Sequence, residues 1–292
     1  MLLVTGASGF VGTHLTKALD KLKIEWVGFD LVNGQDIRDR HQLDKIFELE
    51  QVTEVIHLAA LAGVRRSRKY PREYISTNVE GTQNIVDMCE EHGVKKLISF
   101  SSSSVFGNAK MEERGYSEED KKNPISLYGI TKLAGEFIVN NSEVPSVIVR
   151  PFTIYGEEGR KDEVVYKWLE QIKAGKKITV FGDPDESSRG YVYVGDLVDA
   201  VVKMINGRII FNRPNRDYNL GGCEVVTLED ILDIFKSEFN KLDITCLDRQ
   251  KEDTKHNKAN IDKAKRELGF VPKPQFKQNL RNIIKKFKKE NL

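Results

Sequence analysis

The stretch that decides the fold runs from Leu2 to Gly12 and reads Leu-Leu-Val-Thr-Gly-Ala-Ser-Gly-Phe-Val-Gly. Its apolar start predicts a buried strand, and the apolar residues that recur at helical spacing after Gly9 predict a helix that opens on Phe10 and Val11. Glycines at 6, 9 and 12 fill the turn between them. In a dinucleotide-binding turn, such glycines permit the tight bend, let the backbone approach the pyrophosphate and let helix and strand pack closely. The helix N-terminus then faces the phosphate charge.

The glycine spacing differs from the G-x-G-x-x-G form, and alone it also fits an ordinary strand-to-helix turn. Asp30 favours the dinucleotide interpretation, because it ends the next apolar strand, Trp26 to Phe29. An acidic residue about twenty positions after the turn suits hydrogen bonds to the adenosine ribose hydroxyls. A carboxylate there repels a 2′-phosphate, so we expect NAD rather than NADP.

Length and composition set the broad class of the protein. A chain of 292 residues, 39% hydrophobic and 31% charged, can bury a large core in one broad domain or two lobes. The 46 basic and 44 acidic residues nearly cancel, so we expect no nucleic-acid or membrane partner. Cys89, Cys223 and Cys246 lack disulfide or metal-ligand spacing, which predicts a cytoplasmic location and no metal site. No apolar run reaches membrane-spanning length, and we expect no signal peptide before the first strand.

Three further segments are candidates for the cofactor site. Asp36-Ile37 lies in the loop after Asp30, where a carboxylate and backbone meet the adenine amino group, although Asp36 as a helix cap is an equally good interpretation. Glu54 to Ala60 predicts a buried strand that ends in small residues at Leu58, Ala59 and Ala60, as backbone against a cofactor requires. We interpret His57 within it as a core histidine. A long helix is predicted from Asn78 to Glu91, and we expect Asn78 at its start to bind the cofactor.

Four serines, Ser101 to Ser104, follow the strand predicted at Lys96 to Phe100. In a parallel sheet with crossover helices, ligands collect at the carboxyl ends of the strands, so these hydroxyls are placed to bind a polar substrate. A serine run is also typical of a flexible linker. The apolar strand before it and Val105-Phe106 after it favour the binding loop.

Tyr128 and Lys132 stand four residues apart in a predicted helix and therefore share one face. An ammonium next to a phenol favours the phenolate and lowers a pKa that is normally about 10. Such a base can take a proton from a sugar hydroxyl while a hydride leaves for a nicotinamide. The spacing is common by chance, and its weight comes from the glycine turn and serine loop before it.

The expected fold class is α/β, with a Rossmann-type doubly wound parallel sheet and a smaller α/β substrate-binding lobe. The buried strand Ser146 to Arg150 comes near the end of an NAD-binding domain at residues 1–155. Residues 156–292 are expected mainly in the lobe, and within them residues 191–206 are expected to return to the main sheet. Tyr218 to Gly222 is placed in the lobe.

On these residues the chain resembles the extended short-chain dehydrogenases/reductases, in the branch of NAD-dependent nucleotide-sugar epimerases and dehydratases, over nearly its whole length. The motifs that carry the resemblance are Gly6 to Gly12, His57 to Ala60, Ser101 to Gly107, Tyr128 with Lys132, and Tyr191 to Asp196. The resemblance implies that NAD stays bound and that Tyr128 is the base at the sugar 4-hydroxyl. It implies further that Lys132 activates Tyr128 and binds the nicotinamide ribose, and that Ser102 shares the proton relay.

The serine loop distinguishes among the reactions of that family. Related dehydratases carry Asp-Glu after the catalytic hydroxyl, and related decarboxylases keep the Glu. This chain has Ser103-Ser104 there. Epimerisation at C4 through a 4-keto sugar needs neither acidic group and is the expected reaction.

Two stretches, Leu61 to Ser67 and Arg150 to Asp162, resemble UDP-glucuronate 4-epimerases more than UDP-galactose 4-epimerases. This resemblance implies that Thr153 and Arg160, beside Ser102 to Ser104, bind the sugar carboxylate through charge-assisted hydrogen bonds. The alternative is a surface ion pair between Arg160 and Glu157, Glu158 or Asp162, which contributes little.

Some positions depart from the family pattern. Arg189 is expected at the diphosphate, but Gly190 follows it where the family usually has Asp. Gln250 stands at the position where the family usually has its second diphosphate-binding Arg, and Arg249 is one position away. The chain is also shorter than is usual for the family.

The alternative functions are a UDP-glucose/UDP-galactose 4-epimerase, then a UDP-glucuronate decarboxylase or a non-catalytic NAD-binding relative. The resemblance further implies a homodimer through a four-helix bundle, formed by the Asn78 to Glu91 helix and the helix that carries Tyr128.

Overall fold

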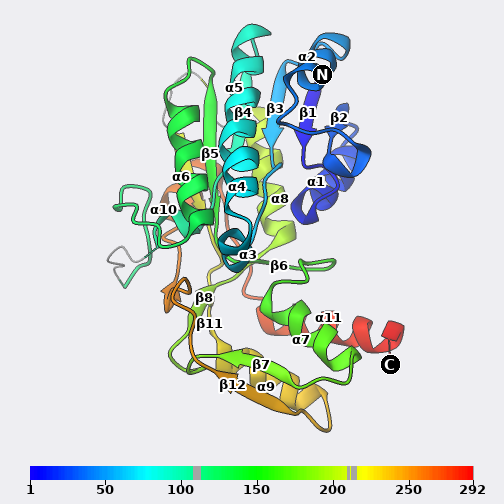
Figure 1. The fold of residues 1–292 in the computed structure, drawn as a ribbon, viewed down its shortest axis with the longest axis vertical. Helices are drawn as coiled ribbons and strands as arrows, with labels where there is room; N and C mark the ends of the chain where they lie inside the picture. Colours follow the sequence, from blue (N-terminus) through cyan, green and yellow to red (C-terminus); the bar gives the residue numbers. More distant parts are fainter. Residues whose placement is uncertain (108–112, 209–210, 212–215, 292) are drawn as a thin grey trace.

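The structure is a computed structural model that describes residues 1–107, 113–208, 211 and 216–291. The sequence from Lys110 to Asn123 is rich in charged residues and predicts a loop; the first three of its residues lie outside the described range, which resumes at Glu113. Two bodies make up the molecule, a larger one around a central sheet and a smaller lobe below it in Figure 1.

The central sheet has six parallel strands in the order β10-β5-β4-β3-β1-β2. Leu3 of β1 lies between Val27 of β2 and Val55 of β3. The chain passes from one side of β1 to the other after β2, so the switch point lies beside β1, where ligands of open α/β sheets bind. The strands are β1 (Leu2–Thr5), β2 (Trp26–Phe29), β3 (Glu54–His57), β4 (Lys96–Phe100), β5 (Ser146–Pro151) and β10 (Arg216–Leu220).

Helices cover both faces of this sheet because alternate strand residues point to opposite faces. Leu2, Val4 and Ile56 pack with α1 (Phe10–Lys21) and α8 (Val194–Lys203). Leu3, Val55 and Leu97 pack instead with α2 (Arg40–Leu49), α5 (Gly81–Glu91) and α6 (Leu127–Asn140). Figure 1 shows α5 and α6 side by side on one face. The predicted α/β fold is confirmed.

Short helices connect these layers. The predicted helix from Asn78 begins differently, because a π-helical turn at Ser76–Glu80 precedes α5. The other short helices are η1 (Leu31–Asn33), α3 (Val64–Lys69), α4 (Pro71–Ile75), η3 (Ser103–Val105) and η4 (Met204–Arg208).

The placement of Tyr218 to Gly222 in the lobe was wrong. β10 is the edge strand of the central sheet, and Tyr218 pairs with Val149 of β5. Tyr218 and Leu220 are fully buried in the same core as Val147. The helix α10 (Asp262–Leu268) covers this edge through Ala264. The prediction failed because the pairing joins segments about seventy residues apart, which local periodicity does not encode.

The segment 191–206 packs mainly into the core of the larger body, where Val192 lies with Val194 and Leu197. α8 returns to the main sheet and packs against α1, as expected. β9 (Val192–Tyr193) pairs instead with β6 (Ile154–Tyr155), outside the main sheet.

The lobe has its own core around Trp168, Phe235 and Leu280, each fully buried. Three helices surround it, and Thr227 with Asp230 forms a capping box that begins α9. Its elements are α7 (Val164–Lys173), β7 (Ile178–Phe181), β8 (Ser188–Gly190), β11 (Val225–Thr227), α9 (Leu228–Glu238), β12 (Ile244–Leu247), β13 (His256–Asn257) and α11 (Phe276–Asn291). Across the described ranges, no helix is both long and apolar enough to cross a bilayer.

Candidate active site

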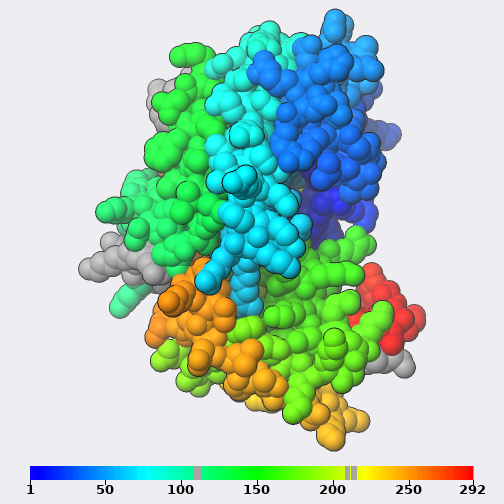
Figure 2. All heavy atoms as spheres, in the orientation of Figure 1, coloured from blue at the N-terminus to red at the C-terminus, as the bar shows by residue number. Residues whose placement is uncertain are grey.

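A cavity of about 1040 Å³ lies between the carboxyl ends of the central strands and the lobe. Two ion pairs bridge its rim, Arg65 to Asp253 at 2.6 Å and Arg68 to Glu252 at 2.8 Å. In Figure 2 the cyan segment around residue 65 meets the orange segment around residue 250 at this rim. The cavity therefore draws its walls from both bodies.

The glycine turn forms one end of the cavity. Gly6 has φ +72°, and a Cβ there would lie 2.7 Å from the backbone nitrogen of Ala59. A Cβ on Gly12 would lie 2.2 Å from the Gly6 carbonyl oxygen, so helix and strand approach more closely than a side chain allows. Gly9, Phe10 and Val11 also line the cavity, and no side chain caps the helix that begins there. The N–H groups of this first turn fit the pyrophosphate of a dinucleotide.

Asp30 ties the glycine turn to the end of β2. Its carboxylate accepts hydrogen bonds from Ser8 N–H at 2.8 Å and from Val32 N–H at 3.0 Å. Each carboxylate oxygen keeps a further lone pair. Asp30 does not line the main cavity.

Asp36 and Ile37 also lie outside the cavity lining. Asp36 forms a bidentate ion pair with Arg38, and the hydrogen bond from Arg38 holds the pKa of Asp36 below its usual value. Asp39, and not Asp36, caps the next helix, α2. Ile37 is buried against Gly81.

The small residues after β3 divide between lining and support. Leu58 and Ala60 line the cavity, whereas Ala59 packs against Gly6. Asn78 stands behind them: its side chain accepts from Leu61 N–H at 2.7 Å and donates to Thr131 Oγ1 at 3.1 Å.

His57 is a buried core histidine, as predicted. The Thr82 hydroxyl donates to Asn78 O, so it accepts from Nε2–H of His57, and Nδ1 accepts from the Thr5 hydroxyl at 2.8 Å. Burial, and then the charge of Lys132, lowers the pKa of His57 to about 3. The ring is therefore neutral in the native protein.

Tyr128, Lys132 and Ser102 all line the cavity. Ser126 caps α6 by accepting from Gly129 N–H, so Tyr128 lies in the first helical turn and Lys132 one turn later. The Ser102 hydroxyl accepts from Ser104 N–H at 3.1 Å, and its hydrogen bond to the Tyr128 phenol offsets part of the rise in phenol pKa that burial causes. The three catalytic candidates therefore share one wall.

The electrostatics of this wall differ from the prediction. Burial raises the pKa of Tyr128, and the largest opposing effect is the charge of Arg160 rather than of Lys132. Burial lowers the pKa of Lys132 to about 8, while the carboxylate of Glu136 opposes this shift. The phenol is thus protonated at neutral pH with protein groups alone around it.

Ser101, Ser102 and Ser103 are buried and the loop continues into η3, which excludes the linker interpretation. Ser102, Ser103 and Ser104 line the cavity. Asn257 of β13 donates from Nδ2 to the Ser103 hydroxyl at 2.8 Å, and its own Oδ1 is buried without a protein partner.

Thr153 and Arg160 line the same cavity. Arg160 donates to Asp162 from Nε at 2.9 Å and from Nη2 at 2.6 Å, and Glu163 lies 3.7 Å from Nη2. The alternative pairing with Asp162 therefore forms, but within the cavity wall rather than on the outer surface.

Arg189 lines the cavity and donates to three backbone carbonyls, those of Ser188, Thr254 and Lys255. Arg249 also lines it, with Nε buried and without a partner, whereas Gln250 does not. Arg249 thus lines the site although it is one position before the one where the family usually has this arginine.

Residues 2–221 match the model of the NAD dependent epimerase/dehydratase family. The chain belongs to this family. UDP-glucuronate 4-epimerase 5 of Arabidopsis thaliana is 33% identical, over 97% of this chain and 74% of that protein. A crystal structure of UDP-glucuronic acid 4-epimerase from Bacillus cereus, in complex with UDP-glucuronic acid and NAD, is 29% identical with a TM-score of 0.89 over 99% of each chain. UDP-glucose 4-epimerase from Thermotoga maritima, with UDP-glucose, is 26% identical with a TM-score of 0.89 over 99% of each chain.

Several lining residues of this epimerase/dehydratase family member were not predicted. Asn257, Lys167 and Arg65 enter the cavity from the lobe and from α3. Arg65 places its guanidinium 4.1 Å from the centre of the Phe181 ring. Arg65 lies in the stretch Leu61 to Ser67 noted above but was not assigned to the site, whereas Asn257 and Lys167 belong to no local motif. Among the described residues, no group of three His, Cys, Asp or Glu side chains is arranged to hold a metal ion.

Proposed function

We propose that this enzyme interconverts UDP-glucuronate and UDP-galacturonate by NAD-dependent epimerisation at C4. The observation that carries the proposal is a single cavity lined by Ser102, Tyr128 and Lys132 together with Thr153 and Arg160. The serine loop in that cavity has hydroxyls and no carboxylates.

The residues present fit NAD. Gly6 and Gly12 let the backbone of the turn pack more tightly than a Cβ would allow, and the uncapped start of α1 offers N–H groups to a pyrophosphate. Asp30 keeps free lone pairs beside this turn for ribose hydroxyls. When bound, NAD supplies the hydride acceptor and donor at sugar C4.

The protein groups move the proton. Tyr128 removes the proton of the 4-hydroxyl as C4 becomes a ketone, and returns it when C4 is reduced on the other face. Lys132 stabilises the phenolate by its charge, and Ser102 donates a hydrogen bond to it. Because burial raises the pKa of Tyr128, the phenolate depends on positive charge near the ring, which Lys132 and Arg160 supply from this chain.

Charge complementarity supports a UDP-uronate. The lining basic residues outnumber the acidic ones, with Asp162, Glu163, Glu252 and Asp253 set against Arg65, Arg66, Lys132, Arg160, Lys161, Lys167, Arg189 and Arg249. A diphosphate and a carboxylate together carry about three negative charges, which this excess of positive charge attracts. We assign Arg189 and Arg249 to the diphosphate, and Arg160 with Thr153 to the carboxylate.

One observation favours the neutral UDP-hexoses as a second candidate. Asp162 already occupies two donors of Arg160, and Glu163 lies close by. Two carboxylates beside the guanidinium reduce the positive charge that a sugar carboxylate meets. UDP-glucose and UDP-galactose meet no such competition.

We also propose a homodimer through α5 and α6, in the cytoplasm. Ile130 and Phe137, two helical turns apart on α6, are 51% and 61% exposed. A groove between α5 and α6 is lined by Phe137, Ile138 and the buried Val86, together with the polar residues Gln83, Glu90, Asn141 and Ser142. Burial of these apolar groups against a second copy is the usual use of such a face. The free thiols Cys89, Cys223 and Cys246 agree with a reducing compartment.

The test is to incubate the purified protein separately with UDP-glucuronate and UDP-glucose and to identify the products by NMR. Formation of UDP-galacturonate from the first is the expected result. Turnover of UDP-glucose alone would replace the uronate proposal with the neutral-hexose one. A UDP-pentose product would indicate decarboxylation.

A further inference from the structure

Glu136 lies on α6 at the same spacing that joins Tyr128 to Lys132, so the three side chains share one helix face. Its side chain is only 5% exposed, and it stands behind the cavity wall rather than in it. A buried carboxylate requires compensation by positive charge and hydrogen bonds. Its partners therefore indicate what it does.

The carboxylate of Glu136 joins three elements of the central body. Arg150, at the end of β5, donates to it from Nε at 2.7 Å and from Nη2 at 2.8 Å. Ser101, directly after β4, donates its hydroxyl at 2.5 Å. Ser101 precedes Ser102, so this contact fixes the strand end from which the catalytic hydroxyl projects.

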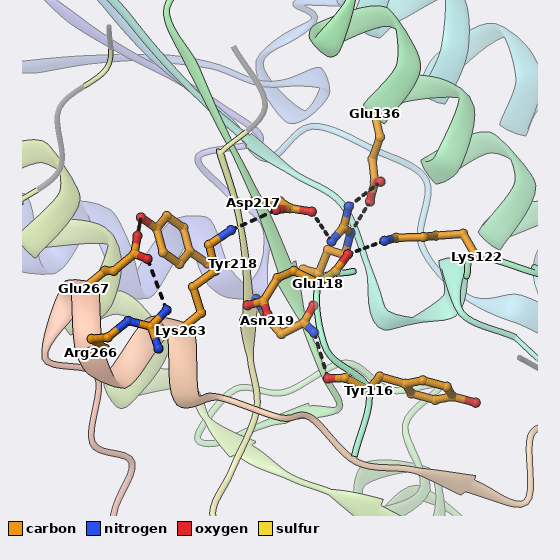
Figure 3. Close-up of polar contacts among 11 residues, drawn as sticks. Tyr116, Glu118, Lys122, Glu136, Asp217, Tyr218, Asn219, Lys263, Arg266 and Glu267 are labelled. Atoms are coloured by element: carbon orange, nitrogen blue, oxygen red, sulfur yellow. Dashed lines mark hydrogen bonds and ion pairs between the residues drawn. The ribbon is translucent and has the colours of Figure 1, made fainter. Parts of the chain in front are cut away.

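Arg150 has a second carboxylate partner. Its Nη1 lies 2.5 Å from Asp217 of β10, and Asp217 also contacts Lys263 of α10 at 3.1 Å. Glu136 and Asp217 both contact this guanidinium, and Figure 3 shows their two carboxylates approaching from different directions. Asp217 is itself paired with Lys263, so Arg150 joins two carboxylates that together tie α6, β5, β10 and α10.

Lys132 lies one turn before Glu136. It is a buried cation, and the carboxylate of Glu136 is the negative charge that compensates it. Lys132 is 7% exposed, and its neighbour His57 on β3 is neutral. Tyr128 on α6 and the hydroxyls of Ser101 and Ser102 after β4 carry no formal charge when protonated. Glu136 opposes the effect of burial on the pKa of Lys132.

We propose that Glu136 is a positioning residue for catalysis: its buried carboxylate keeps Lys132 an ammonium ion and, through Ser101, holds the strand end that carries Ser102. The proposal rests on the proton transfer assigned to Tyr128 above. Glu136 touches neither substrate nor cofactor and acts only through these neighbours.

The first measurement is independent of turnover. Competitive acetylation of Lys132 across a pH series, read by mass spectrometry, reports the pH at which this amine loses its proton in wild type and in Glu136→Gln. Without the carboxylate the ammonium is less stabilised, so Lys132 is expected to become reactive at a pH about one unit lower. An unchanged profile would overturn the proposal even if the sugar substrate is misassigned.

The second measurement uses turnover. Glu136→Gln is expected to lower kcat about tenfold or more with little change in KM, and to move the alkaline limb of the kcat profile to lower pH, because the ammonium is lost earlier. If the wild-type protein turns over no UDP-sugar, the proposed function is contradicted. The acetylation result then decides the role of Glu136 by itself.

The matched control is Asp217→Asn, which removes the other carboxylate of Arg150 but does not touch α6. It is expected to lower the Tm without moving either pH profile. If Glu136→Gln lowers the Tm as Asp217→Asn does and leaves both profiles unchanged, Glu136 is only structural. If Glu136→Gln does not fold, Glu136→Asp and Ser101→Ala take its place. Glu136→Asp keeps the charge and should preserve the Lys132 profile. Ser101→Ala should lower kcat without moving the Lys132 profile.

Discussion

Arg160 and Asp162 form a bidentate ion pair inside the active-site cavity, with Nε to Oδ1 at 2.9 Å and Nη2 to Oδ2 at 2.6 Å. A guanidinium has five N–H donors, so Nη1 and the second hydrogen of Nη2 stay available to another acceptor. A substrate carboxylate can therefore bind beside Asp162 instead of displacing it. This arrangement makes the pair the first place to test substrate choice.

Arg160→Ala is expected to lower kcat/KM for UDP-glucuronate about ten- to hundredfold, because it removes a charge-assisted hydrogen bond worth roughly 1.5–3 kcal/mol. Activity on neutral UDP-hexoses should change little. Asp162→Ala is the matched control: it frees the guanidinium of Arg160 and should not lower kcat/KM for UDP-glucuronate. Equal losses on acidic and neutral sugars would show that Arg160 is structural and would favour the neutral-hexose function.

Tyr128→Phe should abolish turnover while the protein still folds and retains NAD. The phenyl ring keeps the edge contact with Tyr74, whose ring centre lies 6.4 Å away, so packing is preserved and only the acid–base group is lost. General acid–base catalysis contributes typically about 10²–10⁴-fold. Steady-state kinetics and the NAD content of the purified variant provide the measurement. Residual activity above about one part in a hundred would contradict phenolate catalysis.

His57 should make the protein sensitive to mild acid. Its folded pKa of about 3 lies below the unfolded value of 6.5, so at pH below 6.5 the unfolded chain binds the extra proton and stability falls as the pH decreases. Each pKa unit is worth about 1.4 kcal/mol, so the loss amounts to a few kcal/mol by pH 4. Denaturant unfolding of wild type and His57→Gln from pH 4 to 8 measures it. The variant keeps a donor and an acceptor but cannot be protonated, and parallel curves would refute the assignment.

Phe137→Asp is expected to convert a dimer into a monomer, because it places a charge on the apolar face of α6. Val271→Asp is a matched control, since Val271 is 65% exposed, against 61% for Phe137, and lies outside α5 and α6. Sedimentation equilibrium at micromolar concentration distinguishes the two masses. If the wild-type protein is already monomeric under these conditions, the proposed dimer through α5 and α6 is wrong.

The parts of the site that could be predicted from sequence are those encoded by neighbouring residues. The glycine turn was recognised because strand, turn and helix are contiguous from Leu2 to Gly12. Tyr128 and Lys132 were paired because helical periodicity places residues four apart on one face. His57 was predicted to be a core residue from the apolar strand around it. In each case a local rule determines the geometry.

Long-range pairing was beyond such rules. β10 joins β5 across a sequence separation that strand periodicity does not record, and Tyr218 was therefore placed in the wrong body. Asn257 reaches Ser103 across 154 residues because β13 pairs with β8 at the edge of the cavity. Arg249 enters the cavity although Gln250 stands at the expected position.

The sequence by itself determined the family chemistry of this protein: a dinucleotide turn, an acidic residue after β2, and a Tyr-Lys pair after a serine loop. Only the tertiary structure decided the charge state and partners of these groups. Burial, which depends on segments from the whole chain, raises the pKa of Tyr128 and lowers that of Lys132. The partners of Lys132 and Arg160 are set by the positions of α6, β5 and the 156–163 loop in the folded protein. Electrostatic energies in a low-dielectric interior depend on the distances between charged groups rather than on sequence order.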